Sequence, residues 1–225
     1  ETGRVDDVER DSYESRIRNL ESDRQAAAEQ DVAGERQRKA ADTIIGETYP
    51  MLMNDRLEDT RVVTVFLGST DGNNAIRAGV RRMLSDAGAS GPFRFRELEV
   101  PVDADALEAE LARHSELARF SGPDRFEEMG AELARELSAG GDTPLWDALA
   151  PLLVGEEAGI GRLPPDAIVV ARTAEPQQGE TAALLAGFYN GLAEGSVPAV
   201  GVETTKSEPS AIPVYERLGL SSVDA

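Results

Sequence analysis

The chain has 225 residues and is strongly acidic, with 42 Asp and Glu against 23 Lys and Arg, a formal net charge of −19 and no cysteine. This surplus of negative charge repels nucleic acid, so we expect no nucleic-acid partner. Without cysteine the chain can form neither a disulfide nor a thiolate metal site, and a cysteine nucleophile is excluded. The sequence also lacks a run of about 18 apolar residues, the length that a membrane-spanning helix needs.

The first fifty residues differ in composition from the rest of the chain. Residues 1–3 carry no initiating methionine, and we interpret them as a remnant of expression, with a further segment expected upstream. Residues 4–50 are rich in Glu, Arg, Gln and Ala, which predicts one long helix that ends near Pro50. Its apolar residues at coiled-coil spacing are Tyr13, Ile17, Leu20, Ala27, Ala41, Ile45 and Leu52.

This spacing predicts a coiled-coil stalk that joins two copies of the chain in a homodimer. Arg24, Asp31 and Arg38 interrupt the apolar stripe in its middle. The alternative is therefore a solvated helix that packs only on its own domain.

From residue 58 to residue 225 the pattern alternates between strands and helices. The predicted strands are 61–67, 93–100, 166–172 and 197–203, and a fifth begins within 220–225. The predicted helices are 73–87, 103–118, 124–137, 144–154, 180–194 and 212–218. This order predicts an α/β domain, with a Rossmann-like parallel sheet flanked by helices on both faces and preceded by the N-terminal stalk.

Local signals refine several of these elements. The apolar run 61–67 is typical of a strand buried on both faces, whereas the alternation in 93–100 places that strand nearer an edge. Asp103 can cap the helix that follows it, and Asp124 with Glu127 resembles a capping box. In the helix at 73–87 the expected inward stripe is Ile76, Val80, Met83 and Leu84. Residues 155–166 are expected to form a loop.

A Gly- and Ser-rich turn follows the first strand, where many α/β proteins bind phosphate. Its candidate ligand-binding residues are Gly68, Ser69, Thr70, Gly72 and Asn73. The acidic Asp71 would occupy the electropositive start of the next helix, and neither a Walker lysine nor a G-x-G-x-x-G pattern is present. We therefore expect a structural turn and no cofactor, and a small-ligand or nucleotide-binding enzyme that uses loop 68–74 is the alternative.

Few residues could carry metal or acid–base chemistry. His114 is the only histidine, and its spacing from the apolar positions of the preceding helix predicts a partly buried side chain. Met51 and Met53 offer two thioethers, which suit Cu(I), but two such ligands are too few. Met51, Met53 and His114 are thus the metal candidates, and the expectation is that no metal is bound and that the chain is not an enzyme.

The last third of the chain carries a family signal. The matching pieces are PPDAIVVAR at 164–172, Gly-Glu-Thr at 179–181, VPAVGVE at 197–203, Ile-Pro with a nearby Tyr at 212–215, and Ser-Ser-Val-Asp at 221–224. These pieces resemble the MctB family of actinobacterial envelope proteins, which carry the name copper transport outer membrane protein and include SteB-like members. The order of stalk helix, first strand and helices also fits this family.

The resemblance implies an extracytoplasmic domain of the cell envelope, anchored by a transmembrane helix upstream of this chain. By its family name, such a protein is non-enzymatic and linked to copper homeostasis or efflux. SteB-like members imply an alternative, a coiled-coil scaffold that binds a SteA-like membrane protein and regulates cell-wall remodelling or division.

Overall fold

The computed structural model describes residues 53–69, 74–203, 209–217 and 219–224, together with the single residues 24, 39 and 49. The chain divides into two compact units, Glu1–Met53 and Asn54–Ala225, and the fold described below is that of the second unit. The predicted coiled-coil stalk lies almost entirely outside the described residues.

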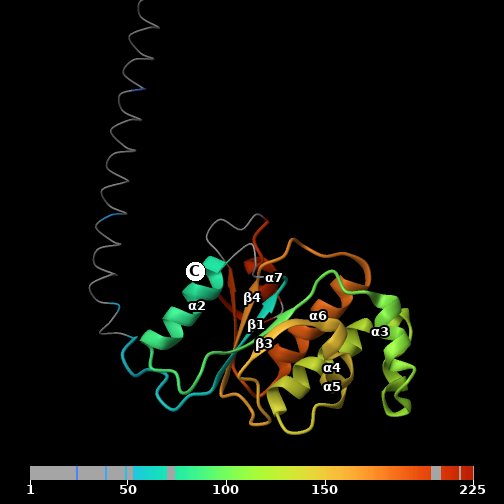
Figure 1. The fold of residues 1–225 in the computed structure, drawn as a ribbon. Helices are drawn as coiled ribbons and strands as arrows, with labels where there is room; N and C mark the ends of the chain where they lie inside the picture. The colour runs from blue at the N-terminus through green and yellow to red at the C-terminus, as the bar shows by residue number, and fades with distance from the viewer. Residues whose placement is uncertain are drawn as a thin grey trace, which may run out of the picture. The chain divides into compact units, whose positions relative to one another are not determined.

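The second unit is a mixed α/β domain built on one six-stranded sheet (Figure 1). In spatial order the strands are β3-β2-β1-β4-β5-β6, with β3 antiparallel to β2 and every other pair parallel. Their bounds are Val62–Leu67 (β1), Arg94–Leu98 (β2), Val154–Ala158 (β3), Ala167–Arg172 (β4), Ala199–Glu203 (β5) and Ser221–Asp224 (β6).

The five parallel strands follow the order of flavodoxin-like doubly wound sheets, 2-1-3-4-5 in chain order. The chain moves outward in one direction from β1 to β2 and in the other direction from β4 to β6. The boundary between β1 and β4 is therefore the switch point of the sheet, where such folds hold their ligands.

Helices cover both faces of the sheet, as the sequence predicts (Figure 1). The helices are Asn74–Asp86 (α2), Ala104–Leu111 (α3), Phe126–Ala139 (α4), Pro144–Leu153 (α5), Gly179–Glu194 (α6) and Ile212–Arg217 (α7). Two short 3₁₀ helices, Ser115–Phe120 and Pro123–Arg125, lie between α3 and α4.

Strand β1 joins two apolar cores because successive side chains of a strand point to opposite faces. Val63, Val65 and Leu67 belong to the larger core, which includes side chains from α3 to α7. Phe66 points to the smaller core, with Ile76 and Val80 of α2. All six residues of β1 are buried, which confirms the prediction for this apolar run.

The prediction of a loop over 155–166 is wrong at its start. After α5 the chain enters β3, an antiparallel edge strand in which four of five residues are exposed. Glu156 and Glu157 give β3 the polar composition of a loop, and charged residues on an edge strand oppose further strand pairing. Strand β2 consequently lies one position inside the edge.

The helix predicted from Asp103 to Ala118 begins as expected but ends earlier. The Asp103 side chain accepts a hydrogen bond from Ala106 N at 3.0 Å, which confirms the cap. The α-helix stops at Leu111, and a 3₁₀ helix follows in which Leu117 and Phe120 are buried whereas Ala118 is exposed. The spacing of three residues between these two apolar side chains matches the 3₁₀ repeat.

Two further local predictions are wrong. Asp124 lies within the second 3₁₀ helix, and α4 begins at Phe126 without a side-chain cap, so no capping box forms with Glu127. Met83 is also predicted on the inward stripe of α2, but its side chain is 36% exposed. The buried residues of this stripe are Ile76 and Val80, and Leu84 beside them is half-buried.

None of the helices within the described residues has the length and apolar composition needed to cross a membrane.

Candidate binding site at the carboxyl edge of the sheet

The switch point of the sheet opens into a small apolar crevice. We call it the switch-point crevice, and its volume is about 170 Å³. Its walls come from the ends of β1 and β2, the end of β4 and the segment after it, α6, and α7. The lining residues are Leu67, Val100, Arg172, Ala174, Glu175, Pro176, Gln177, Ala182, Leu185, Ala186, Tyr189 and Val214.

The walls of the crevice are held together by backbone contacts between β1 and the segment after β4. Thr173 N and Ala174 N both donate to Leu67 O, at 3.0 and 2.9 Å, and the Thr173 hydroxyl donates to Gly68 O at 2.7 Å. Gly68 has a φ of +109°, and a Cβ atom there would lie 2.6 Å from the Ala174 Cβ. Only glycine fits, because the two segments are in contact.

This packing also bears on the predicted ligand loop. Gly68 N donates to Leu98 O at 2.9 Å, so this amide is already bound within the sheet. Ser69 is exposed, whereas Thr70, Gly72 and Asn73 lie outside the described residues. The structural turn expected at residues 68–74 stays a prediction, and so does its alternative, ligand binding by this loop.

Arg172 is the one basic side chain of the switch-point crevice, and it is engaged within the fold. It donates to Pro209 O, and its guanidinium lies 3.8 Å from the Glu203 carboxylate. Glu203 is only 2% exposed and also accepts a hydrogen bond from Ala211 N at 2.5 Å. The charge of Arg172 is thus balanced by a buried carboxylate at the end of the neighbouring strand.

Two tyrosines pack beside this ion pair. The rings of Tyr189 and Tyr215 meet edge to face, with centroids 5.5 Å apart. Burial raises the pKa of Tyr189 well above its ordinary value and the pKa of Tyr215 to about 12. Both phenols are therefore harder to ionise than an exposed tyrosine.

A second concavity, the acidic hollow, adjoins the switch-point crevice. It has a volume of about 510 Å³ and lies at the carboxyl ends of β1 and β2 and the start of β3. Its lining residues are Ser69, Glu97, Glu99, Val100, Pro101, Gly155 and Glu156. Val100 lines both concavities, so the crevice and the hollow share a wall.

Three carboxylates face the acidic hollow. Glu97 is 7% exposed, and Glu99 is exposed. Glu156 pairs with Arg77 of α2 through two hydrogen bonds of 2.6 and 2.9 Å, and these lower the pKa of Glu156. Glu99 is thus the exposed carboxylate of the hollow, while Glu156 is paired with Arg77.

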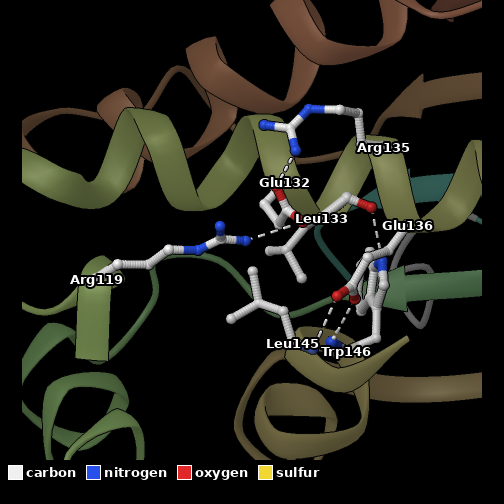
Figure 2. Close-up of polar contacts among 7 residues, drawn as sticks. All are labelled: Arg119, Glu132, Leu133, Arg135, Glu136, Leu145 and Trp146. Atoms are coloured by element: carbon white, nitrogen blue, oxygen red, sulfur yellow. Dashed lines mark hydrogen bonds and ion pairs between the residues drawn. The ribbon is translucent and has the colours of Figure 1, made fainter. Parts of the chain in front are cut away.

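A third polar cluster, around Glu136 of α4, has a structural role (Figure 2). The Glu136 carboxylate accepts hydrogen bonds from Leu145 N and Trp146 N, each at 3.0 Å, at the start of α5. The Trp146 indole donates to Leu133 O at 2.7 Å. Glu136 is 7% exposed, so it caps α5 from the neighbouring helix and fixes the two helices together.

The sequence-predicted metal candidates do not form a described site. Met51 lies outside the described residues, and Met53 belongs to the first compact unit. His114 follows α3, with its ring nitrogens 3.3 Å from Glu110 and 3.6 Å from Glu116. Among the described residues, no group of three His, Asp or Glu side chains could hold a metal ion.

Of the residues that line the two concavities, only Ser69 is among the candidates predicted from the sequence. Several of the others, such as Leu67, Val100 and Ala174, end or follow a buried parallel strand at the carboxyl edge of the sheet. This position becomes a usable signal only when the order of the strands is known, and the sequence does not give this order.

Comparison with known families matches residues 3–218 to the family described as "Copper transport outer membrane protein, MctB". The match spans both the N-terminal segment and the α/β domain. A search of curated proteins finds no match.

Proposed function

The chain belongs to the MctB family of copper transport outer membrane proteins, and on this basis we propose that it serves copper homeostasis at the cell envelope as a docking domain. In this proposal the α/β domain binds another protein at the carboxyl edge of its sheet. It neither catalyses a reaction nor holds the metal itself.

The observation that carries the proposal is that the switch-point crevice is small and that its polar groups are already engaged or buried. Small-molecule sites in proteins occupy roughly 300–1,000 Å³, whereas the crevice has a volume of about 170 Å³. Its basic group, Arg172, is bound to Pro209 and Glu203, and its phenol, Tyr189, is buried. Such a site favours an apolar protein side chain over a nucleotide or a reacting substrate.

The side chains available as copper ligands also support a docking domain that does not hold the metal itself. Cu(I) prefers thiolate and thioether ligands, and the chain has no cysteine. Of the described methionines outside the N-terminal unit, Met129 is buried in the core and Met83 lies at the surface of α2. The described residues therefore do not fit copper as a bound cargo, and the copper function would pass through a partner.

The family name associates the protein with the outer membrane. We place the domain outside the cytoplasm, anchored by a transmembrane helix upstream of this chain and paired with a second copy through residues 4–50. The partner in this proposal is a membrane protein of the envelope.

Site-specific photo-cross-linking tests this function in cells. A photoreactive residue is placed at Glu175, on the rim of the switch-point crevice, or at Glu194, an exposed residue at the far end of α6. We expect a discrete protein adduct from position 175 and none from position 194. Equal labelling at both positions, or no adduct, would contradict a docking role, and the identity of the adduct distinguishes a copper protein from a cell-wall regulator.

A further inference from the structure

The switch-point crevice and the acidic hollow are neighbours at the carboxyl edge of the sheet and differ in chemistry. Val100, after β2, contributes to both, and the ends of β1 also reach both concavities through Leu67 and Ser69. A bound protein segment that crosses Val100 can therefore contact both concavities.

The crevice has the size and polarity to accept one apolar side chain. An apolar cavity of about 150 Å³ accommodates a single benzene ring, and the crevice volume is about 170 Å³. Its α6 wall presents Ala182 and Ala186, one turn apart, with Leu185 between them. The small alanines leave the space that a larger side chain would otherwise fill.

The acidic hollow selects for positive charge. Glu97, Glu99 and Glu156 line it; Glu97 is buried, Glu156 is paired with Arg77, and Glu99 is exposed. Negative charge also dominates the whole chain, at −19. A concavity lined by one sign of charge attracts an incoming cation.

From this juxtaposition we propose that the carboxyl edge recognises a protein segment in which an apolar residue stands within a few residues of a lysine or arginine. The apolar side chain enters the switch-point crevice, and the basic side chain pairs with Glu99, the exposed carboxylate of the acidic hollow. The inference rests on the proposed docking function and specifies the chemistry of the partner's segment.

Phage-displayed random dodecapeptides, selected against the full chain, supply the probe. Selected peptides are synthesised, and their dissociation constants are measured by calorimetry against the wild type and four variants. Ala182→Leu fills the crevice at little cost in helix propensity, and Ala193→Leu makes the same change at an exposed site of the same helix. Glu99→Lys reverses a charge in the hollow, and Glu58→Lys reverses one in an exposed turn.

We expect the selected peptides to share an apolar residue next to a basic one. Ala182→Leu and Glu99→Lys should each weaken binding by about tenfold or more, about 1.4 kcal/mol or more, while Ala193→Leu and Glu58→Lys leave it within about twofold. A peptide with its basic residue changed to glutamate should bind Glu99→Lys better than it binds the wild type. This exchange tests the charge pairing even if a variant is slightly destabilised.

Selection of peptides without this pattern, failure to select any peptide, or equal binding by all variants would overturn the inference. A cross-link from position 175 together with insensitivity to both crevice and hollow variants would leave the docking function in place and reject only the segment chemistry. Absence of any cross-link would instead reject the docking function.

Discussion

Helix α6, which forms one wall of the switch-point crevice, is held against α4 by glycines at the contact. A Cβ atom added to Gly187 would lie 1.9 Å from Glu127 O, and one added to Gly130 would lie 1.9 Å from Leu184 O. Both obstacles are backbone atoms, which cannot rotate away. Gly187→Ala therefore forces the two helices apart by roughly an ångström in a close-packed interior.

The loss of stability in Gly187→Ala can be worked out from the cost of overpacking. Overpacking a core costs about 1–3 kcal/mol, and the upper end applies here because backbone meets backbone. Alanine recovers about 1 kcal/mol through its higher helix propensity. The net loss is then about 2 kcal/mol, which lowers the Tm of a domain of this size by about 4–8 °C.

Thermal unfolding followed by the fluorescence of Trp146 measures this effect. Trp146 is the only tryptophan and is 1% exposed, so its signal reports on the α/β domain alone. Gly79→Ala in α2 is the matched control, because no atom lies within 4 Å of the added Cβ, and its Tm should rise by about 2–4 °C. A Tm for Gly187→Ala at or above that of the wild type would refute the close α4–α6 contact.

Four further outcomes are expected. Glu136→Gln should lower the free energy of unfolding by about 1–3 kcal/mol, since one buried N–H of α5 loses its acceptor. The control, Glu194→Gln at an exposed position, should change the free energy of unfolding little. Equal effects of the two substitutions would contradict the capping role of Glu136. Hydrogen bonds from Arg61 lower the pKa of Asp166 from 3.8 to about 2, so its contribution to stability is present above about pH 4 and is lost as the pH falls through about 2. Urea midpoints compared between about pH 5 and pH 2 should therefore fall less for Asp166→Asn than for the wild type, and identical profiles would argue against this linkage. Calorimetric titration of the full chain with Cu(I) and Cu(II) should reveal no binding tighter than roughly 10 μM, about −7 kcal/mol, and a tighter site would refute indirect copper handling. Light scattering should find a dimer for the full chain and a monomer after removal of residues 4–48; a monomer at both lengths would exclude the coiled coil.

Elements with strong local signals could be predicted from the sequence. The apolar runs at 61–67 and 166–172 form the buried central strands β1 and β4, because a strand covered on both faces needs apolar residues on both. Asp103 caps α3 as its position suggests. Each of these features depends on residues that are close together in the chain.

Features that depend on distant residues could not be predicted. The switch-point crevice joins Leu67, Val100 and Ala174, which come together only because β1 lies between β2 and β4. Strand β3 was missed because its glycine and glutamates suit an exposed edge as well as a loop. The order of strands in a sheet arises from tertiary packing, and no local pattern in this sequence specifies it.

The most direct test of the docking claim is calorimetric titration of the full chain with the purified protein that cross-links to position 175. The account predicts saturable binding by the wild type and by Ala193→Leu, with at least about tenfold weaker binding by Ala182→Leu, about 1.4 kcal/mol or more. Equal affinity of all three chains, or no measurable binding, would contradict recognition at the switch-point crevice.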